Sequence, residues 1–216
     1  MPEDRKPYRR EAEDKRRQAL ITATLSLVSE GGARVATVRA IAERAGVTAG
    51  LIRHYFQSKE NLIGQAFRHL MTGMSEDSSA VLAYAPKDPH ARLAAFVAAS
   101  LRPPVVDRDA VVTWASFIQE TRRNPAMLDI HRQTYLGFRD RLRDLIAALP
   151  VARNEEELRQ LAIACNAVID GLWLEGSTLP DAFAKGELVH IGIRSVGAML
   201  GVDLQFYLLL SEPPTT

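Results

Sequence analysis

Apolar residues recur along most of the chain three and four positions apart, which is the spacing of one face of an α-helix. Gly, Pro and Asn interrupt these stripes, for example at Gly31-Gly32, Pro103-Pro104 and Asn124-Pro125. No stretch shows the sustained alternation of a half-buried strand. The pattern predicts an all-α chain of about nine helices, over residues 11–29, 38–45, 49–55, 59–84, 89–101, 107–123, 125–149, 154–175 and 187–200.

The two ends of the chain carry their own signals. Residues 1–10 are charged, contain two prolines and lack apolar periodicity, so they are predicted to form a disordered arm. The apolar run at residues 206–210 would favour aggregation if exposed, so it should pack on the rest of the chain or on a second subunit. The basic residues of the arm can either follow DNA into the minor groove or be a solvated tail; they are Arg5, Lys6, Arg9 and Arg10.

Residues 37–62 carry the densest set of local signals. Thr37 can cap a first helix, Gly46 follows its last turn, and Thr48 can cap a second helix almost at once. Two short helices joined by a tight turn containing Gly form a helix-turn-helix, whose second helix enters the DNA major groove. Its buried scaffold is predicted to consist of Val38, Ile41, Ala42, Ala45 and Phe56.

This stretch resembles the DNA-binding motif of the TetR family of bacterial regulators. The family usually has a Leu-Tyr pair before its His/Tyr-Phe element, but here the pair is Ile52-Arg53. The resemblance implies a homodimer that reads a palindromic double-stranded DNA operator. It also implies that the last two helices, about residues 154–175 and 187–200, form a four-helix dimer interface. The matching residues are Thr37-Val38, Ile41-Ala42, Ala45-Gly46-Val47-Thr48, His54-Tyr55-Phe56, Lys59 and Leu62.

The residue types of the motif suggest two kinds of contact with DNA, one to phosphates and one to bases. Thr37, Thr48 and Lys59 lie at helix starts, where phosphates bind readily, and such contacts set register without reading sequence. Arg53 is the best candidate for reading a base, because arginine pairs bidentately with guanine. The small residues Ala49 and Gly50 allow close approach to the DNA. The ring-bearing residues His54 and Tyr55 can either hydrogen-bond phosphate or serve local packing.

The distribution of charge agrees with a DNA-reading head. The whole chain has 27 Lys and Arg and 26 Asp and Glu, a net charge of +1. Residues 1–60 hold 12 basic and 8 acidic residues, a net of +4, whereas residues 61–216 hold 15 and 18, a net of −3. We therefore expect an arm and helix-turn-helix domain over residues 1–58 and a helical effector-binding and dimerisation domain over residues 59–216.

The second part of the chain offers candidate ligand residues. The RHYF sequence (residues 53–56) and AVIDGLWLEG (residues 167–176) resemble the BetI-type subgroup, which implies repression of osmoprotectant genes and a response to choline. Aromatic faces with a carboxylate suit a quaternary ammonium ion. Buried aromatic residues at helical spacing equally describe a plain core. The candidate residues are Trp114, Phe117, Tyr135, Asp170 and Trp173.

Other classes of function find little support. The five histidines are scattered, and the chain has no HExxH, GxSxG or Gly-rich phosphate loop, so we expect no enzyme, no cofactor and no metal site. Cys165 lies among apolar residues and reads as a small buried hydrophobe rather than a redox sensor. No apolar run is long enough to span a membrane, and the cytoplasm is the expected location. The predicted function is a ligand-released transcriptional repressor; the alternative is a DNA-binding architectural or partner-controlled protein without a small ligand.

Overall fold

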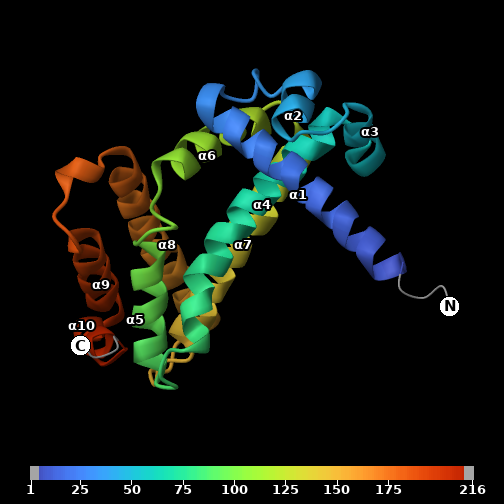
Figure 1. Cartoon of the computed structure of the whole chain (residues 1–216). Helices are drawn as coiled ribbons and strands as arrows, with labels where there is room; N and C mark the ends of the chain where they lie inside the picture. The colour runs from blue at the N-terminus through green and yellow to red at the C-terminus, as the bar shows by residue number, and fades with distance from the viewer. Residues whose placement is uncertain (1–4, 212–216) are drawn as a thin grey trace. The chain divides into compact units, whose positions relative to one another are not determined.

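The computed structural model describes the backbone of residues 5–211 and the side chains of residues 11–208. Within residues 5–211 the chain forms ten α-helices and two 3₁₀ helices and has no strand, which confirms the all-α class (Figure 1). In chain order they are α1 (Arg5–Gly31), α2 (Val38–Arg44), α3 (Gly50–Phe56), α4 (Lys59–Ala80), η1 (Val81–Ala83), α5 (Pro89–Ser100), α6 (Arg108–Thr121), α7 (Pro125–Ala147), α8 (Glu155–Thr178), η2 (Pro180–Ala182), α9 (Glu187–Leu200) and α10 (Leu204–Ser211).

The largest departures from the predicted elements lie at the two ends. Helix α1 begins at Arg5, so residues 5–10 of the predicted arm are helical, while residues 1–4 and the side chains before residue 11 lie outside the described part. Pro7 does not prevent this, because it falls in the first turn, where no intrahelical N–H is required. Residues 204–211 form a tenth helix, whose start is capped by the Asp203 carboxylate.

The end of helix α8 also differs from the prediction. Gly176 was expected to close this helix, but α8 continues to Thr178 and ends before Pro180. A Cβ atom at Gly176 would collide with the Leu188 side chain, so this glycine permits close approach of the chain at the start of α9. At the other end, Asn154 and Glu157 form a capping box, with two N–H to oxygen bonds of 2.9 Å.

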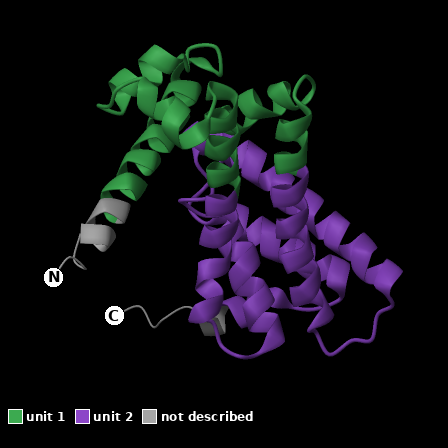
Figure 2. Cartoon of the chain, turned by 90° about the vertical axis from the view of Figure 1, so that its right-hand side faces the viewer, with its two compact units in different colours: residues 1–71, 112–131 green, residues 72–111, 132–216 purple. Residues whose placement is uncertain are grey.

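The chain divides into two compact units (Figure 2). Unit 1 comprises residues 1–71 and 112–131, and unit 2 comprises residues 72–111 and 132–216. Helices α4, α6 and α7 each contribute residues to both units. Three parts of the region predicted as effector domain thus cluster with the N-terminal helices: residues 59–71 of α4, most of α6 and the start of α7.

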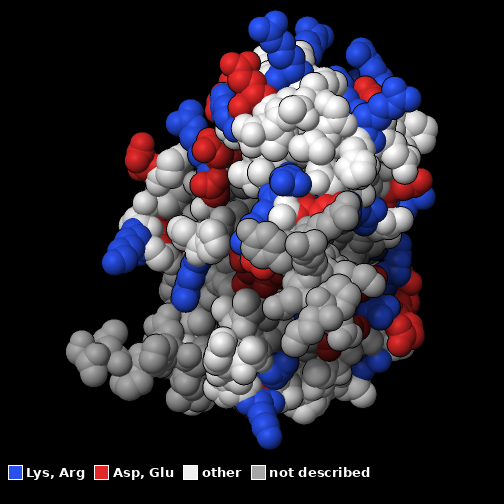
Figure 3. Space-filling model, turned by 45° about the vertical axis from the view of Figure 1, so that its right-hand side comes forward, with Lys and Arg blue, Asp and Glu red and all other residues white. Residues whose placement is uncertain are grey.

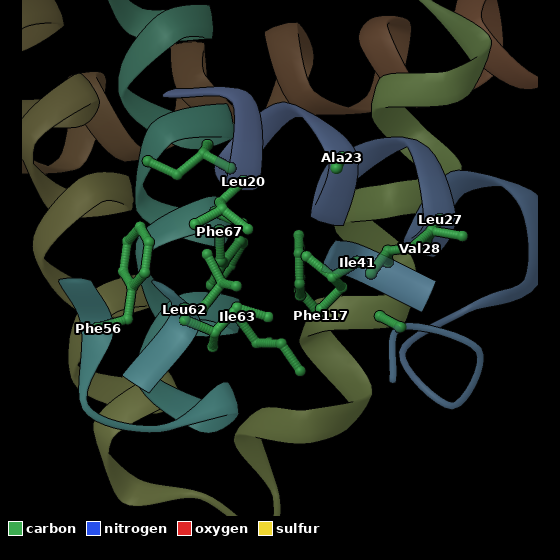
Figure 4. Packing of buried hydrophobic residues seen from close by; sticks show 14 of the residues in the cluster. Leu20, Ala23, Leu27, Val28, Ile41, Phe56, Leu62, Ile63, Phe67 and Phe117 are labelled. Carbon is green, nitrogen blue, oxygen red and sulfur yellow. The ribbon is translucent and has the colours of Figure 1, made fainter. Parts of the chain in front are cut away.

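Unit 1 is built around one apolar core (Figure 4). Helices α2 and α3 have seven residues each and are too short to be stable alone, so burial of their apolar faces holds them in place. The rings of Phe67 and Phe117 lie 4.9 Å apart between centroids. The core side chains include Leu20, Val28, Ile41, Ile52, Phe56, Leu62, Phe67, Phe117 and Met127.

Unit 2 packs α5, α8, α9 and α10 together. Helix α5 is buried on most sides and contacts α9, α10 and α8, and the rings of Phe96 and Phe138 lie 5.1 Å apart. Because α10 packs on α5 and α9, the prediction that the apolar tail covers part of the chain is confirmed. Cys165 is fully buried, and burial raises the pKa of its thiol to about 11, as expected of a structural cysteine.

Candidate DNA interface and effector site

Backbone hydrogen bonds fix the turn between α2 and α3, and the sequence predicted part of this arrangement. The Thr37 hydroxyl accepts a hydrogen bond from the Ala40 N–H at 3.1 Å, which confirms the predicted cap. Gly46 has φ +65, and the N–H groups of Gly46 and Val47 donate to the carbonyls of Glu43 and Ala42. This paired arrangement is a Schellman motif, which ends α2 sharply and directs the chain into α3.

The prediction that Thr48 caps α3 is wrong. Helix α3 begins at Gly50, its N-cap residue is Ala49, and no side-chain hydrogen bond caps it. The Leu51 N–H donates instead to the Thr48 backbone carbonyl at 3.0 Å. A backbone turn thus closes the start of α3, and the Thr48 side chain is exposed rather than folded back on the helix.

Helix α3 separates its core face cleanly from its outer face. Ile52 and Phe56 are buried, whereas Arg53 and His54 are exposed. A Cβ atom added to Gly50 would meet nothing within 4 Å, so the start of α3 is open. Of the candidate DNA contacts, Thr37, Thr48, Ala49, Gly50, Arg53 and His54 are exposed, and Tyr55 and Lys59 are half-buried.

One member of the predicted scaffold lies outside the core. Val38 is 39% exposed, although Ile41, Ala42 and Phe56 are buried and Ala45 is half-buried. Val38 is the first residue of α2, and its Cβ points back toward the helix start, away from the turn that packs. The apolar spacing was right, but the short helix offers only its second turn to the core.

His54 has partners within unit 1. Its ring meets the Tyr55 ring edge-on at 4.9 Å between centroids, and its Nε2 lies 3.9 Å from Oε1 of Glu13. These contacts fit a local packing role without removing either ring from the exposed side of α3. Figure 3 shows Lys and Arg side chains over the part of unit 1 that carries α1–α3, with acidic side chains between them.

An ion pair that the sequence did not reveal joins α2 to α1. Arg44 donates two hydrogen bonds to the Glu30 carboxylate, at 2.6 and 2.9 Å, and a third to the Ser26 hydroxyl. The hydrogen bonds from Arg44, followed by one that the Ser26 hydroxyl donates at 2.9 Å, lower the pKa of Glu30 to about 2. Nothing in the sequence marks residues 14 positions apart on different helices as partners, so only the fold brings this bidentate pair together.

A second contact supports α3 from the side of α1. The Arg17 guanidinium lies over the Phe56 ring, 5.3 Å from its centroid. Phe56 is 4% exposed and belongs to the core of unit 1, which confirms its predicted place in the buried scaffold. Ser58 then caps α4 through its hydroxyl, which accepts from the Asn61 N–H at 3.1 Å.

The candidate ligand residues are divided between the two units. Trp114 and Phe117 belong to unit 1, where Phe117 is fully buried in the core and Trp114 packs against it. Tyr135, Asp170 and Trp173 belong to unit 2. The indole N–H of Trp173 donates to the Val105 carbonyl at 2.9 Å, so its polar group takes part in the packing of unit 2.

Tyr135 and Asp170 form a hydrogen-bonded network with a third residue that the sequence analysis missed. The Tyr135 hydroxyl donates to Oδ2 of Asp170 at 2.5 Å, and the Asn166 amide donates to both groups at 2.8 Å. Burial, followed by the interaction with Asp170, raises the pKa of Tyr135 to about 12. Asn166 precedes Asp170 by four residues on α8, a spacing that would have identified it as a neighbour.

Two further searches of the described residues bear on function. No helix there combines the length and apolarity that crossing a membrane requires. No three His, Cys, Asp or Glu side chains of residues 11–208 gather as they would around a metal ion.

Comparison with known sequences assigns both parts of the chain. Residues 20–66 match the family of bacterial regulatory proteins called the tetR family, and residues 89–201 match the BetI-type transcriptional repressor C-terminal family. The chain is 32% identical over 163 residues to the HTH-type transcriptional regulator BetI of Burkholderia cenocepacia (strain HI2424), covering 75% of this chain and 82% of that protein. It is 33% identical over 178 residues to BetI 2 of Chromohalobacter salexigens, covering 82% and 84%.

Solved structures agree in fold. A transcriptional regulator from Pseudomonas aeruginosa PAO1 is similar with a TM-score of 0.79 and 27% identity, covering 90% of this chain and 94% of that one. A regulator from Saccharomonospora viridis, solved in complex with choline, is similar with a TM-score of 0.64 and 21% identity, covering 86% and 95%. The chain therefore belongs to the TetR family of DNA-binding transcriptional regulators, with a C-terminal region of the BetI type.

Proposed function

We propose that this protein is a ligand-responsive repressor that binds a palindromic operator as a homodimer and is released when a small molecule binds its C-terminal domain. The observation that carries the proposal is the form of α3. The Schellman turn leads into α3, Ile52 and Phe56 pack this helix on the core, and Arg53 is exposed. A helix supported on one face and open on the other suits the major groove.

The proposed DNA contacts fall into two groups. Arg53 reads a base pair, and Ala49 and Gly50 allow the start of α3 to approach the groove. The positioning contacts to phosphate come from Thr37, Thr48, His54, Tyr55 and Lys59. The exposed Thr48 hydroxyl supports its assignment to this second group, because it is not engaged in capping α3.

The proposed dimer interface is formed by α8 and α9. Leu174 on α8 is 44% exposed and Met199 on α9 is 38% exposed, and both are large apolar side chains. Ala167 and Gly171 are also exposed and lie on the same face of α8 as Leu174, at helical spacing. Pairing this face with its copy would bury the apolar side chains and place two α3 helices on two half-sites.

The proposed effector is a quaternary ammonium compound such as choline, bound in residues 59–216 while residues 1–58 read DNA in the cytoplasm. The Asp170 carboxylate, held by Tyr135 and Asn166, supplies a fixed negative charge, and Trp173 of the same unit supplies aromatic surface. The Saccharomonospora viridis relative was solved with choline, which supports this class of ligand. Trp114 and Phe117, which pack in the core of unit 1, are left out of this proposed site.

The alternative, a DNA-binding protein without a small ligand, makes a different experimental prediction. Purified full-length protein should select specific fragments from genomic DNA, and choline or betaine aldehyde should release them at concentrations that quench or shift Trp fluorescence. Selection of specific DNA that neither compound releases would remove the quaternary ammonium effector but keep the regulator. Failure to select any sequence would overturn the repressor proposal itself.

A further inference from the structure

Val38 is a large apolar side chain that lies outside the core of unit 1 and beside the proposed DNA contacts. It is the first residue of α2 and is 39% exposed. It belongs neither to the core nor to the half-buried residues that pack against the core. Single exposed valines are common on protein surfaces. This one directly follows Thr37, at the start of the first helix of the helix-turn-helix.

The folding of α2 does not require a valine at this position. A β-branched side chain loses freedom in a helix, and alanine has the higher helix propensity. The cap of α2 comes from Thr37, whose hydroxyl accepts from the Ala40 N–H, and Ile41 and Ala42 supply the buried face. The exposed part of the Val38 side chain is therefore available to a partner outside the chain.

The charges around Val38 favour DNA as that partner. Residues 31–42 include two exposed arginines, Arg34 and Arg39, and contain no Asp or Glu. By contrast, Val112 is 41% exposed in the same unit but lies three residues after an aspartate. Exposed cations attract the phosphates of DNA, so an apolar group between them is brought close to the duplex.

The nearest acids along the chain lie away from the start of α2. Glu30, near the end of α1, is held by Arg44 through hydrogen bonds of 2.6 and 2.9 Å. Glu43 lies on the last turn of α2, five positions after Val38. Cations therefore outnumber acids beside this valine.

The position of α2 in the motif selects the part of the DNA that Val38 can meet. The first helix of a helix-turn-helix crosses the DNA backbone while the second helix enters the major groove. The start of α2 therefore lies at the edge of the groove, where the proposed function places Thr37 on a phosphate. The C5-methyl of thymine faces the major groove on the side nearest the backbone of its own strand. An apolar side chain at this edge meets that methyl before any deeper polar group.

The shape of the valine side chain suits contact with a methyl group. The Cβ of Val38 tilts toward the helix start, so its two methyl groups lie on the side of Thr37 and away from the core. A β-branched side chain is stiff at χ1 and loses little freedom on binding. Cytosine has a hydrogen where thymine has the methyl, so this contact distinguishes the two pyrimidines.

We propose that Val38 contacts the C5-methyl of one thymine in each operator half-site, so that α2 reads sequence together with α3. This inference rests on the operator binding of the proposed function. It makes Val38 a specificity-determining residue in addition to Arg53. The two residues read by different means, Val38 through apolar contact and Arg53 through hydrogen bonds.

Deoxyuridine, which differs from thymidine only in lacking the methyl group, tests the contact. Each thymine in one half-site of the selected operator is replaced in turn, and the affinity of the full-length protein is measured by fluorescence anisotropy at fixed salt. At one position the replacement should weaken wild-type binding about fourfold, as expected for one buried methyl group. Val38→Ala should weaken binding to the thymine operator and should bind the thymine and uracil forms of that position equally.

Matched variants assign the effect to one side chain. Val112→Ala makes the same change at a similarly exposed position of α6 and should keep the preference for thymine. Val35→Ala, at a 42% exposed position in the loop before α2, should keep it too. The melting temperature of Val38→Ala should equal or slightly exceed that of wild type, because alanine is the better helix former. A lost preference in that variant is then not a lost fold.

Three results would overturn the assignment of Val38: no effect of uracil at any position, an effect that persists in Val38→Ala, or a preference lost in Val35→Ala instead. Each of these leaves operator binding intact, because the unmodified operator is still bound. Failure to select any DNA sequence would instead remove the proposed function and this inference with it.

Discussion

At the scale of single residues, Arg53 is the position where this chain leaves the usual pattern of its family. The family resemblance pairs a leucine with a tyrosine where this chain has Ile52-Arg53. Ile52 is 2% exposed and keeps the packing role of an apolar residue, whereas Arg53 is exposed on the outer face of α3. The difference from the expected pattern therefore lies on the exposed face of α3 and leaves the packing of Ile52 intact.

Arg53→Ala should weaken binding to the selected operator by about 1–3 kcal/mol and relax the preference at one base pair. Affinities for the operator and for its single-base variants, measured by fluorescence anisotropy at fixed salt, check this. Arg122→Ala, which removes an exposed arginine outside α3, is the control and should leave base preference unchanged. Equal loss on operator and random DNA would make Arg53 a phosphate contact.

The Glu30–Arg44 ion pair predicts a pH dependence of stability. The folded-state pKa of Glu30 is about 2, below its ordinary value of 4.5. A depressed acid pKa adds stability that is fully present above pH 4.5 and is lost as the pH falls toward 2. Glu30→Gln should therefore lower the melting temperature at neutral pH, and the difference from wild type should shrink below pH 4.5.

The dependence on salt concentration distinguishes the loss of the Glu30–Arg44 ion pair from a packing defect. Both partners are exposed, with side chains 41% and 56% accessible, so 1 M NaCl should reduce the difference between wild type and the Glu30 variant. Glu43→Gln, an exposed acid on α2, should have little effect in either condition. A salt-independent loss in the Glu30 variant would point to packing or to the Ser26 hydrogen bond instead of the ion pair.

At the scale of elements, the turn between α2 and α3 depends on one backbone conformation. Gly46 has φ +65, which costs an L-residue about 1–2 kcal/mol, so Gly46→Ala should destabilise the protein by about this amount. Gly50→Ala is the matched control, because Gly50 lies at the start of α3 with open space where its Cβ would be. It should leave stability unchanged or slightly higher. Urea denaturation measures both; equal effects would contradict the role assigned to Gly46.

The elements show what local sequence signals can and cannot predict. Thr37 and Gly46 were predicted correctly because each acts within a few residues of itself. Val38 was misplaced because apolar periodicity does not show that the first residue of a short helix directs its Cβ toward the helix start, away from the turn that packs. The cap of α3 was wrongly assigned to the Thr48 hydroxyl, because the backbone carbonyl of the same residue can accept the hydrogen bond that closes the turn.

Interactions between distant segments escaped prediction for a different reason. The Glu30–Arg44 pair and the Tyr135–Asn166–Asp170 network join residues of separate helices, and their pairing depends on helix rotation and packing. Tyr135 and Asp170 were chosen as ligand residues from their chemistry alone. The spacing of Asn166 and Asp170 on α8 was readable from the sequence, whereas their hydrogen bonds to Tyr135 on α7 depend on the folded chain.

At the scale of the whole molecule, the proposed function requires two subunits, because one α3 reads only one half-site. The surface that joins the two subunits must be apolar and must not be needed for the folding of the single chain. Leu174 meets both conditions, being 44% exposed on α8 beside the small residues Ala167 and Gly171. Its substitution should therefore act on assembly before it acts on the fold.

Leu174→Arg should convert the dimer to a monomer, because two copies of the α8 face would each bring a desolvated charge into the contact. Sedimentation velocity measures the change in mass, and circular dichroism checks that helix content is retained. Leu128→Arg is a matched control, since Leu128 is 41% exposed but lies on α7.

The monomer should lose affinity for the full operator far more than for a single half-site, because tethering of the two reading heads is lost. A Leu174 variant that remains dimeric would move the interface away from this face of α8, and one that is monomeric yet binds the full operator normally would remove the dimer from the mechanism.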